Sequence, residues 1–299
     1  MSPQQRVVLA SRTSGASLTS LIPPESAHLG ALLARYDNAR DRDLRGRDRR
    51  FLIESERVLH RFLGSSWLCE SILVTPKIES ALAPFLATRT DAPTVFVADD
   101  ATMTSISGYR LHGGALAIGE RSWHPASADA LLDRLPREGP LRAVVAEGVV
   151  QVDNIGTIFR NVACLGGHAV LLDADCADPL LRKTIRFSMG RVFDVPWGTS
   201  RDLRTDLDAL RGLDVAVIAL ELAVNARSLR ALPRRDRVAF VVGNEARGLS
   251  AGTLAACDDV VMIPSAVPPA AVACDVDVGG SRSLNVGVAA GIALYELLR

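Results

Sequence analysis

The sequence has almost no lysine, no excess of either charge and no grouped cysteines. Lys77 and Lys183 are the only lysines among 34 basic residues, and 34 acidic residues balance them to a net charge of zero. A protein with zero net charge does not bind a polyanion over its whole surface. The zero net charge does not exclude a local basic patch. The five cysteines are widely spaced, without a CxxC pair or a Cys/His cluster. This spacing fits neither a disulfide framework nor a structural zinc site.

Long hydrophobic runs are missing as well. The longest apolar stretch, from Val286 to Leu298, contains Glu296 and is too short to span a bilayer. Residues 1–20 contain no continuous apolar segment before a cleavage site, so we expect a flexible tail and no signal peptide. The 299 residues are 48% hydrophobic, enough to bury full-sized cores. We therefore expect a soluble, reduced, cytoplasmic protein of two domains.

The two halves of the chain differ in pattern. The second half alternates helical stretches with five buried-strand runs, at 142–146, 168–172, 215–219, 238–242 and 259–263, which predicts an α/β domain with a mostly parallel sheet. The first half shows β-like runs at 71–74, 94–97 and 115–118, and helical patterns at 29–36 and 51–62. We predict a tail over 1–20, a first α/β domain over 21–120, a linker with one short helix over 121–140, and a second domain over 141–299.

Three segments of the second half carry polar residues and each follows a strand. They are residues 154–160 (NIGTIFR), residues 243–249 (GNEARGL) and residues 283–291 (SLNVGVAAG). Parallel sheets bind ligands at the carboxyl ends of their strands, so all three are candidates for a site. Each alone also has a purely structural explanation: Asn154 as a helix cap, a β-turn with a surface glutamate, and a cap at Ser283 or Asn285. A nucleotide-dependent enzyme is disfavoured, because neither a GxGxxG segment nor a Walker phosphate loop occurs.

Taken together and in this order, the three segments resemble the signature motifs of the SpoU/TrmH family of SPOUT RNA methyltransferases. The family pattern is Asn-x-Gly-x-x-x-Arg, then Gly-Asn-Glu-x-x-Gly-Leu/Ile, then Ser-Leu-Asn-Val. The run from Asp178 to Trp197 is similar to the family's middle segment, and RDRRFLIESERVL more weakly resembles its N-terminal substrate-binding domain. The resemblance implies an α/β fold: a catalytic domain with a deep trefoil knot over 141–299, preceded by a ribosomal-protein-like α/β domain over 21–120 that binds RNA.

The resemblance also implies a cofactor and a reaction. S-adenosylmethionine would be held largely by backbone groups at Gly243, Ile263 and Leu284, with Leu220 as a further candidate. Its methyl group would pass to a ribose 2′-hydroxyl of RNA, and no metal is required because the sulfonium already supplies the leaving group. A hydroxyl is a poor nucleophile, so its proton must be removed or its developing charge stabilised.

Arg160 occupies the family position proposed for this task. An arginine side chain is almost always protonated, so it would act as a base only with special desolvation, and positioning a phosphate or stabilising charge is the alternative. Asn154, Ser283 and Asn285 would orient the ribose and the arginine. Glu245 would hold its turn or pair with a basic group.

Two basic clusters are candidates for RNA contacts. Residues 40–50 contain six arginines and three aspartates, and a second cluster follows at 182–191. Clusters of basic residues are more often solvent-exposed faces than binding sites. In a chain that resembles an RNA enzyme, however, two such clusters favour contacts with RNA phosphates. We predict RNA contacts at Arg45, Arg47, Arg49, Arg182, Lys183 and Arg186. The family also forms homodimers through the knotted domain, and the small residues of the C-terminal helix suit close packing.

The sequence departs from the family pattern at two places. Gln151-Val152-Asp153-Asn154 stands where the family often has Asp-Pro-x-Asn, and residues 264–282 are longer than the usual connection. This insertion is a lid or, more in keeping with its composition, a disordered loop. Ribosomal RNA is the expected substrate and transfer RNA the alternative. A non-catalytic RNA-binding or ribosome-associated protein with the same fold is the competing hypothesis, and the modified nucleotide does not follow from the sequence.

Overall fold

The computed structural model describes residues 5–10, 21–22, 26–37, 39–41, 44, 49–108, 111, 113–121, 127–223, 226–264 and 283–298. The chain divides into two compact units. The first comprises Met1–His124 and Leu180–Phe193, and the second comprises Pro125–Pro179 and Asp194–Arg299. The sequence-based division kept all of 141–299 together, whereas the contacts place Leu180–Phe193 with the first unit. Among the described residues, no helix is long and apolar enough to cross a membrane.

The first unit is built from these elements: β1 (Arg6–Val8), α1 (Ala27–Ala34), β2 (Arg50–Glu54), α3 (Glu56–Leu63), β3 (Cys69–Val74), α4 (Pro76–Ala87), β4 (Thr94–Val97), α5 (Asp100–Ser107), β5 (Ala115–Glu120), α8 (Arg182–Phe187) and the 3₁₀ helix η2 (Arg191–Phe193). The second unit is built from α6 (Ala128–Leu132), β6 (Leu141–Ala146), α7 (Val152–Cys164), β7 (Ala169–Leu172), β8 (Trp197–Thr199), α9 (Leu203–Gly212), β9 (Ala216–Leu220), β10 (Arg227–Ser228), η3 (Leu229–Ala231), β11 (Arg237–Val242), α10 (Ala251–Ala255), β12 (Asp259–Met262) and α11 (Val286–Glu296).

The second unit contains a parallel sheet of seven strands in the order β10-β12-β9-β11-β6-β7-β8. The five predicted strands are confirmed as β6, β7, β9, β11 and β12. Strands β8 and β10 were not predicted, because segments of three and two residues are too short to show a period. All carboxyl ends of a parallel sheet meet at one edge, so the polar segments that follow β6, β9, β11 and β12 lie along that edge.

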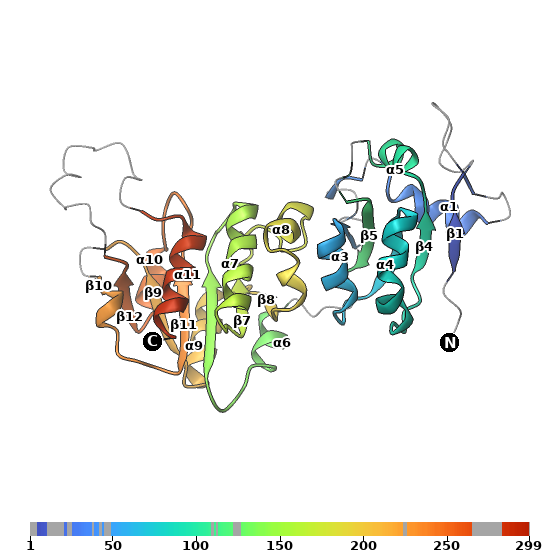
Figure 1. Ribbon diagram of the computed structural model, residues 1–299. Helices are drawn as coiled ribbons and strands as arrows, with labels where there is room; N and C mark the ends of the chain where they lie inside the picture. Colours follow the sequence, from blue (N-terminus) through green and yellow to red (C-terminus); the bar gives the residue numbers. More distant parts are fainter. Residues whose placement is uncertain are drawn as a thin grey trace. The chain divides into compact units, whose positions relative to one another are not determined.

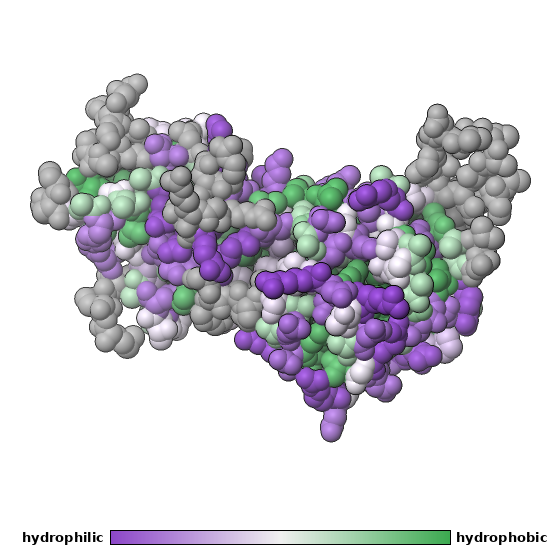
Figure 2. All heavy atoms as spheres, turned by 180° about the vertical axis from the view of Figure 1, so that it is seen from behind, coloured by the Kyte–Doolittle hydropathy of each residue, from purple (hydrophilic) through white to green (hydrophobic). Residues whose placement is uncertain are grey.

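Helices cover both faces of this sheet (Figure 1). Helices α7 and α11 lie side by side on one face, and α9 and α10 cover the other. The short helix predicted within the linker is α6, which packs against α9 and β8 of this unit. The view from behind shows hydrophilic side chains intermixed with small hydrophobic patches (Figure 2). The trefoil knot stays a prediction, because most of the connection between β12 and α11, residues 265–282, lies outside the described residues.

The first unit contains a mixed sheet in the order β1-β4-β3-β5-β2. The prediction of a helix over 51–62 is wrong in its first part, because residues 51–54 pair with β5 as strand β2 and the helix begins only at Glu56. Ser55 makes the junction with φ of 85°. Phe51, Leu52 and Ile53 are all buried, and such a short continuous apolar run does not distinguish a strand from a helix.

An aromatic cluster holds the segment Leu180–Phe193 in the first unit. Phe193 of η2 stacks on Phe51 of β2 at 5.8 Å and contacts Phe62 and Trp67 at 5.0 and 5.8 Å between ring centroids. Gly119 of β5 lies opposite Phe51, where a Cβ would come within 2.3 Å of the ring. The glycine therefore makes room for the ring at the centre of this cluster.

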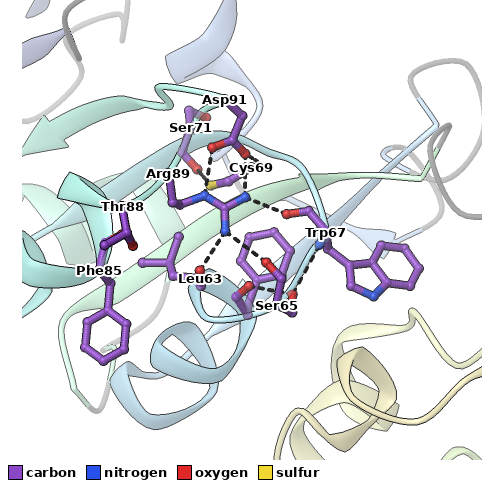
Figure 3. Close-up of polar contacts among 10 residues, drawn as sticks. Leu63, Ser65, Trp67, Cys69, Ser71, Phe85, Thr88, Arg89 and Asp91 are labelled. Atoms are coloured by element: carbon purple, nitrogen blue, oxygen red, sulfur yellow. Dashed lines mark hydrogen bonds and ion pairs between the residues drawn. The ribbon is translucent and has the colours of Figure 1, made fainter. Parts of the chain in front are cut away.

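The side chain of Arg89 holds the loop that follows α3 in place through hydrogen bonds (Figure 3). The Arg89 guanidinium donates to the backbone carbonyls of Leu63 and Trp67 at 2.7 and 2.6 Å, and to the Asp91 carboxylate at 2.7 Å. Asp91 also accepts a 2.7 Å bond from the Cys69 N–H. Burial raises the pKa of the Asp91 carboxyl, but the bonds from Arg89 and Cys69 outweigh it, so this pKa lies below its ordinary value.

Candidate functional site

Asn154 is the buried centre of the predicted site. It lies in the first turn of α7, is 2% exposed, and donates from Nδ2 to Oε1 of Glu245 at 2.9 Å. The Glu245 carboxylate also accepts from the backbone N–H groups of Val150 and Gln151 at 3.3 and 3.1 Å. A carboxylate at a helix N-terminus is favoured by the helix dipole and by the free N–H groups there. Gln151 is the N-cap residue. The prediction of Asn154 as the cap is therefore wrong, and Glu245 supplies the capping interaction.

Asn285 brings the third segment to the same centre. Its Nδ2 donates to Oδ1 of Asn154 at 2.7 Å, and its Oδ1 accepts from the Val288 N–H at 3.2 Å, which makes it the N-cap of α11. Asn154 thus bonds Glu245 through its amide nitrogen and Asn285 through its amide oxygen. The structure brings together one residue from each of the three segments.

Close packing of α7 against α11 fixes this arrangement. A Cβ at Gly287 would lie 2.8 Å from the Thr157 side chain, and one at Gly291 would lie 2.7 Å from Nδ2 of Asn161. That Asn161 nitrogen donates to the Gly287 carbonyl at 2.7 Å. The small residues of the C-terminal helix therefore serve packing within the chain.

The second segment forms a tight turn after β11. The Asn244 N–H donates to the Gly248 carbonyl and the Gly248 N–H donates back, at 3.1 and 2.9 Å. A Cβ at Gly243 would lie 2.4 Å from the backbone of Gly248, and Gly248 itself has φ of 66°. Any side chain at Gly243 would push the turn off the sheet edge, so glycine is required there by sterics.

Two further polar residues at this edge, Glu147 and Glu221, were missed by the sequence analysis. Glu221 accepts from the Leu249 N–H at 2.8 Å, and Glu147 accepts from the N–H and the hydroxyl of Ser250 at 2.9 and 2.7 Å. Asn244 donates to the Gly148 carbonyl at 2.7 Å. Glu147 and Glu221 each come directly after a strand, β6 and β9, and this position is the signal that could have identified them. They hold the turn after β11 between neighbouring strand ends.

The predicted cofactor residues lie along the same edge. Leu220 is the last residue of β9, which pairs with β11 on one side and β12 on the other. Gly243 and Ile263 are the first residues after those two strands. Leu220 and Ile263 are half-buried, and Leu284, just before α11, is 48% exposed. These apolar side chains are accessible and lie beside Gly243, which has no side chain to cover its backbone. The arrangement suits a ligand with a flat ring that packs on the apolar side chains and bonds to the backbone.

Arg160 and Ser283 lie at the surface. Arg160 is exposed on α7, one turn beyond Thr157, whose own neighbour on α11 is Gly287. Ser283 is exposed two residues before Asn285. Both residues are accessible to solvent, as groups that contact a substrate must be.

The predicted RNA-binding residues that are described lie in the first unit. Arg182, Lys183 and Arg186 are on α8, and Arg49 is exposed directly before β2 with φ of 49°. Helix α8 packs against β2, so two stretches far apart in the sequence share one body. Arg45 and Arg47 lie outside the described residues.

Cys176 lies near the site but is not activated. Its thiol donates to the Ala146 carbonyl at 3.3 Å, and burial raises the pKa of the thiol well above its ordinary value. A thiol in this state is a poor nucleophile at neutral pH. The part of the chain that the structure describes contains no group of three or more His, Cys, Asp and Glu residues that could hold a metal ion.

A parallel α/β sheet whose three polar segments are bonded together at its carboxyl edge agrees with the class that the motifs predicted, the SPOUT methyltransferases. The chain belongs to the SpoU rRNA methylase family, whose sequence model matches residues 142–295. A protein of Mycobacterium bovis named as an uncharacterized tRNA/rRNA methyltransferase is 32% identical over 86% of this chain and 87% of its own length. A Burkholderia 23S rRNA (guanosine-2′-O-)-methyltransferase, RlmB, is 30% identical over 74% of this chain and 84% of its own length.

The fold also matches solved structures over nearly the whole chain. An AdoMet-bound rRNA methyltransferase from Sinorhizobium meliloti superposes with a TM-score of 0.71 at 22% identity, covering 92% of this chain and 95% of that one. This likeness of fold extends over both units.

Proposed function

We propose that this chain transfers the methyl group of S-adenosylmethionine to a ribose 2′-hydroxyl of ribosomal RNA. The observation that carries the proposal is the hydrogen-bonded chain Glu245–Asn154–Asn285, which joins the three family motifs at the carboxyl edge of the sheet. Family membership and the RlmB relatives support the reaction type and the ribosomal substrate. The competing hypothesis, an RNA-binding protein without activity, does not account for this intact arrangement.

The cofactor fits the residues at the strand ends. Leu220, Ile263 and Leu284 would contact the faces of the adenine ring, and the backbone of the Gly243 turn would bond its polar edge. Glu147 and Glu221 hold that turn in place through Ser250 and Leu249. When bound, S-adenosylmethionine supplies a methyl group already activated on a positively charged sulfur.

Arg160 is the residue we assign to the reacting hydroxyl. Its guanidinium stabilises negative charge on the 2′-oxygen and positions an adjacent phosphate, which an always-charged planar donor does well. Asn285 and Ser283 orient the ribose beside it. Asn154 and Glu245 act through other residues, because their hydrogen bonds fix the start of α7 and the position of Asn285.

A homodimer is part of the proposal. Helix α11 exposes Val288, Ile292 and Tyr295, which follow the spacing of one helical face and are 47%, 37% and 56% exposed. An apolar stripe of this kind on an exposed helix suits burial against a second copy. We also assign the protein to the cytoplasm, where ribosomal RNA is available.

Mapping of ribose methylation tests the function directly. Ribosomal RNA from cells with and without the gene is compared for 2′-O-methyl groups, and one site is expected to disappear and to return with the wild-type gene but not with Arg160→Ala. If every site persists without the gene, the assignment fails. Calorimetry with S-adenosylhomocysteine separates the competing hypothesis, since an inactive RNA-binding protein has no need to bind it.

A further inference from the structure

Helix α8 buries a threonine and exposes a phenylalanine. Thr184, Ile185 and Ser188 are buried at 0%, 1% and 0% exposure, whereas Phe187 is 42% exposed. All eight phenylalanines belong to the described residues, and the other seven are buried or half-buried. A helix that needed only to pack would turn its phenylalanine inward and its hydroxyl groups outward. Packing within the chain therefore does not explain the position of Phe187.

The neighbours of Phe187 are cationic. The Arg186 guanidinium lies 6.0 Å from the centroid of the Phe187 ring, and Lys183 is one turn earlier on the same exposed face. Neither Lys183 nor Arg186 forms an ion pair with another described residue. Within the described part of the chain, two exposed cations without an ion pair thus lie beside an exposed aromatic ring.

The helix is held firmly enough to present this face. The carboxylate of Asp41 accepts from the Arg182 N–H at 3.1 and 3.2 Å, and Glu54 of β2 pairs with the Arg182 side chain at 3.8 Å. At its other end the Gly190 N–H donates to the Ile185 carbonyl at 2.9 Å, with Met189 and Gly190 both at positive φ. These contacts hold the helix so that Phe187 lies on its exposed side.

We propose that Phe187, with Lys183 and Arg186 beside it, is a stacking platform for an unpaired base of the RNA substrate. This inference rests on the proposed function, because it names the part of the RNA that the first unit recognises. Proteins that bind single-stranded RNA combine an aromatic ring under a base with cations on the flanking phosphates. In a continuous duplex the faces of the bases are already stacked, so the platform selects a loop, a bulge or a strand end.

The test compares two labelled RNA probes with the full-length protein by fluorescence anisotropy. One probe is a 20-nucleotide single strand of mixed sequence without self-pairing, and the other is the blunt duplex of the same sequence. Phe187→Ala is expected to weaken binding of the single strand by about 5- to 150-fold, the effect of losing one base–aromatic stack, and to leave duplex binding unchanged. Phe187→Trp should retain the affinity, and its added fluorescence should be quenched by the single strand.

Lys183→Ala provides the matched control on the same face. It should weaken both probes and reduce the dependence of affinity on salt, because it removes a phosphate contact. The proposal is overturned if Phe187→Ala binds the single strand as the wild type does, if it weakens both probes equally, or if it changes the sedimentation of the protein, which would indicate a protein contact. If the wild type binds neither probe, the result contradicts RNA binding by this chain, and it contradicts the proposed function as well.

Discussion

The side-chain oxygen of Asn154 accepts a 2.7 Å hydrogen bond from the Asn285 amide, across 131 residues of sequence. The other end of the same Asn154 amide donates to Glu245. An asparagine is suited to this position because its amide has a donating nitrogen and an accepting oxygen in one plane. A carboxylate in its place would have an acceptor where the structure needs a donor.

Asn154→Asp is expected to destabilise the protein at neutral pH by about 1–3 kcal/mol, the cost of an unmatched buried polar group. It would place a second carboxylate against Glu245, and two carboxylates at hydrogen-bond distance favour a shared proton. Because protonation restores the donor, the loss should diminish as the pH falls from 8 towards 5. Thermal unfolding followed by circular dichroism across this range measures the effect.

Asn161→Asp is the matched control for Asn154→Asp. It lies on the same helix and also loses a donor, to the Gly287 carbonyl, but that partner is not a carboxylate. Its destabilisation should not diminish on acidification between pH 8 and 5. The same pH profile for both variants would contradict the role assigned to Glu245.

Arg160→Ala is expected to lower kcat for methyl transfer by about 10²–10³-fold, as the loss of one charge-stabilising donor does in other active sites. Stability and binding of S-adenosylhomocysteine should be unchanged, because the side chain is exposed and acts on the RNA. Arg204→Ala, at an exposed arginine on α9, should have wild-type activity. Loss of cofactor affinity in Arg160→Ala would count against the assigned role.

Gly243→Ala is expected to lower cofactor affinity at least tenfold, because its Cβ would meet the Gly248 backbone at 2.4 Å and displace the turn. Gly252→Ala is the matched control: its Cβ has no neighbour closer than 3.9 Å, and alanine should stabilise α10 by about 0.5–1 kcal/mol. Calorimetry with S-adenosylhomocysteine measures both. Equal affinities for the two variants would show that the turn does not hold the cofactor.

Asp91→Asn is expected to cost about 3–5 kcal/mol of unfolding free energy at pH 7, because it leaves the charge of the Arg89 side chain, which is 7% exposed, without its carboxylate partner. The pKa of Asp91 is lowered, so its stabilisation is present above the ordinary value of 3.8 and is lost as the pH falls below it. The difference between wild type and variant in urea titrations should therefore shrink below about pH 3.8.

The exposed ion pair of the same unit, Arg6 with Glu79, is the control for Asp91→Asn. Glu79→Gln should cost far less than Asp91→Asn, since a pair in which the Arg6 side chain is 56% exposed is largely screened by water. A comparable cost for both variants would mean that burial does not strengthen the Arg89–Asp91 interaction.

Ile292→Glu is expected to convert a dimer into monomers by placing a charge on the apolar stripe of α11. Sedimentation velocity at micromolar concentration measures the change. Val8→Glu, at a 62% exposed valine of β1, should leave the association state unaltered. A wild type that is monomeric at all concentrations would refute the proposed dimer.

The sequence by itself determined the five main strands of the second unit, its parallel α/β class and the three motifs that identify the family. These features are local: a buried strand is a short apolar run, and a motif is a spacing of residue types along one segment. The same reasoning misread residues 51–54, because Phe51, Leu52 and Ile53 are buried together and the run has no distinguishing period.

Only the tertiary structure decided which motif residues meet and where the middle segment lies. Asn154 finds partners 91 and 131 residues away, and helix α8 joins the first unit through Phe193 and Asp41 although it lies within the second half of the sequence. Such contacts depend on how the chain returns to the sheet edge, and no local period records that path. For the same reason the exposure of Phe187, an ordinary apolar residue in the sequence, became visible only once its helix was placed.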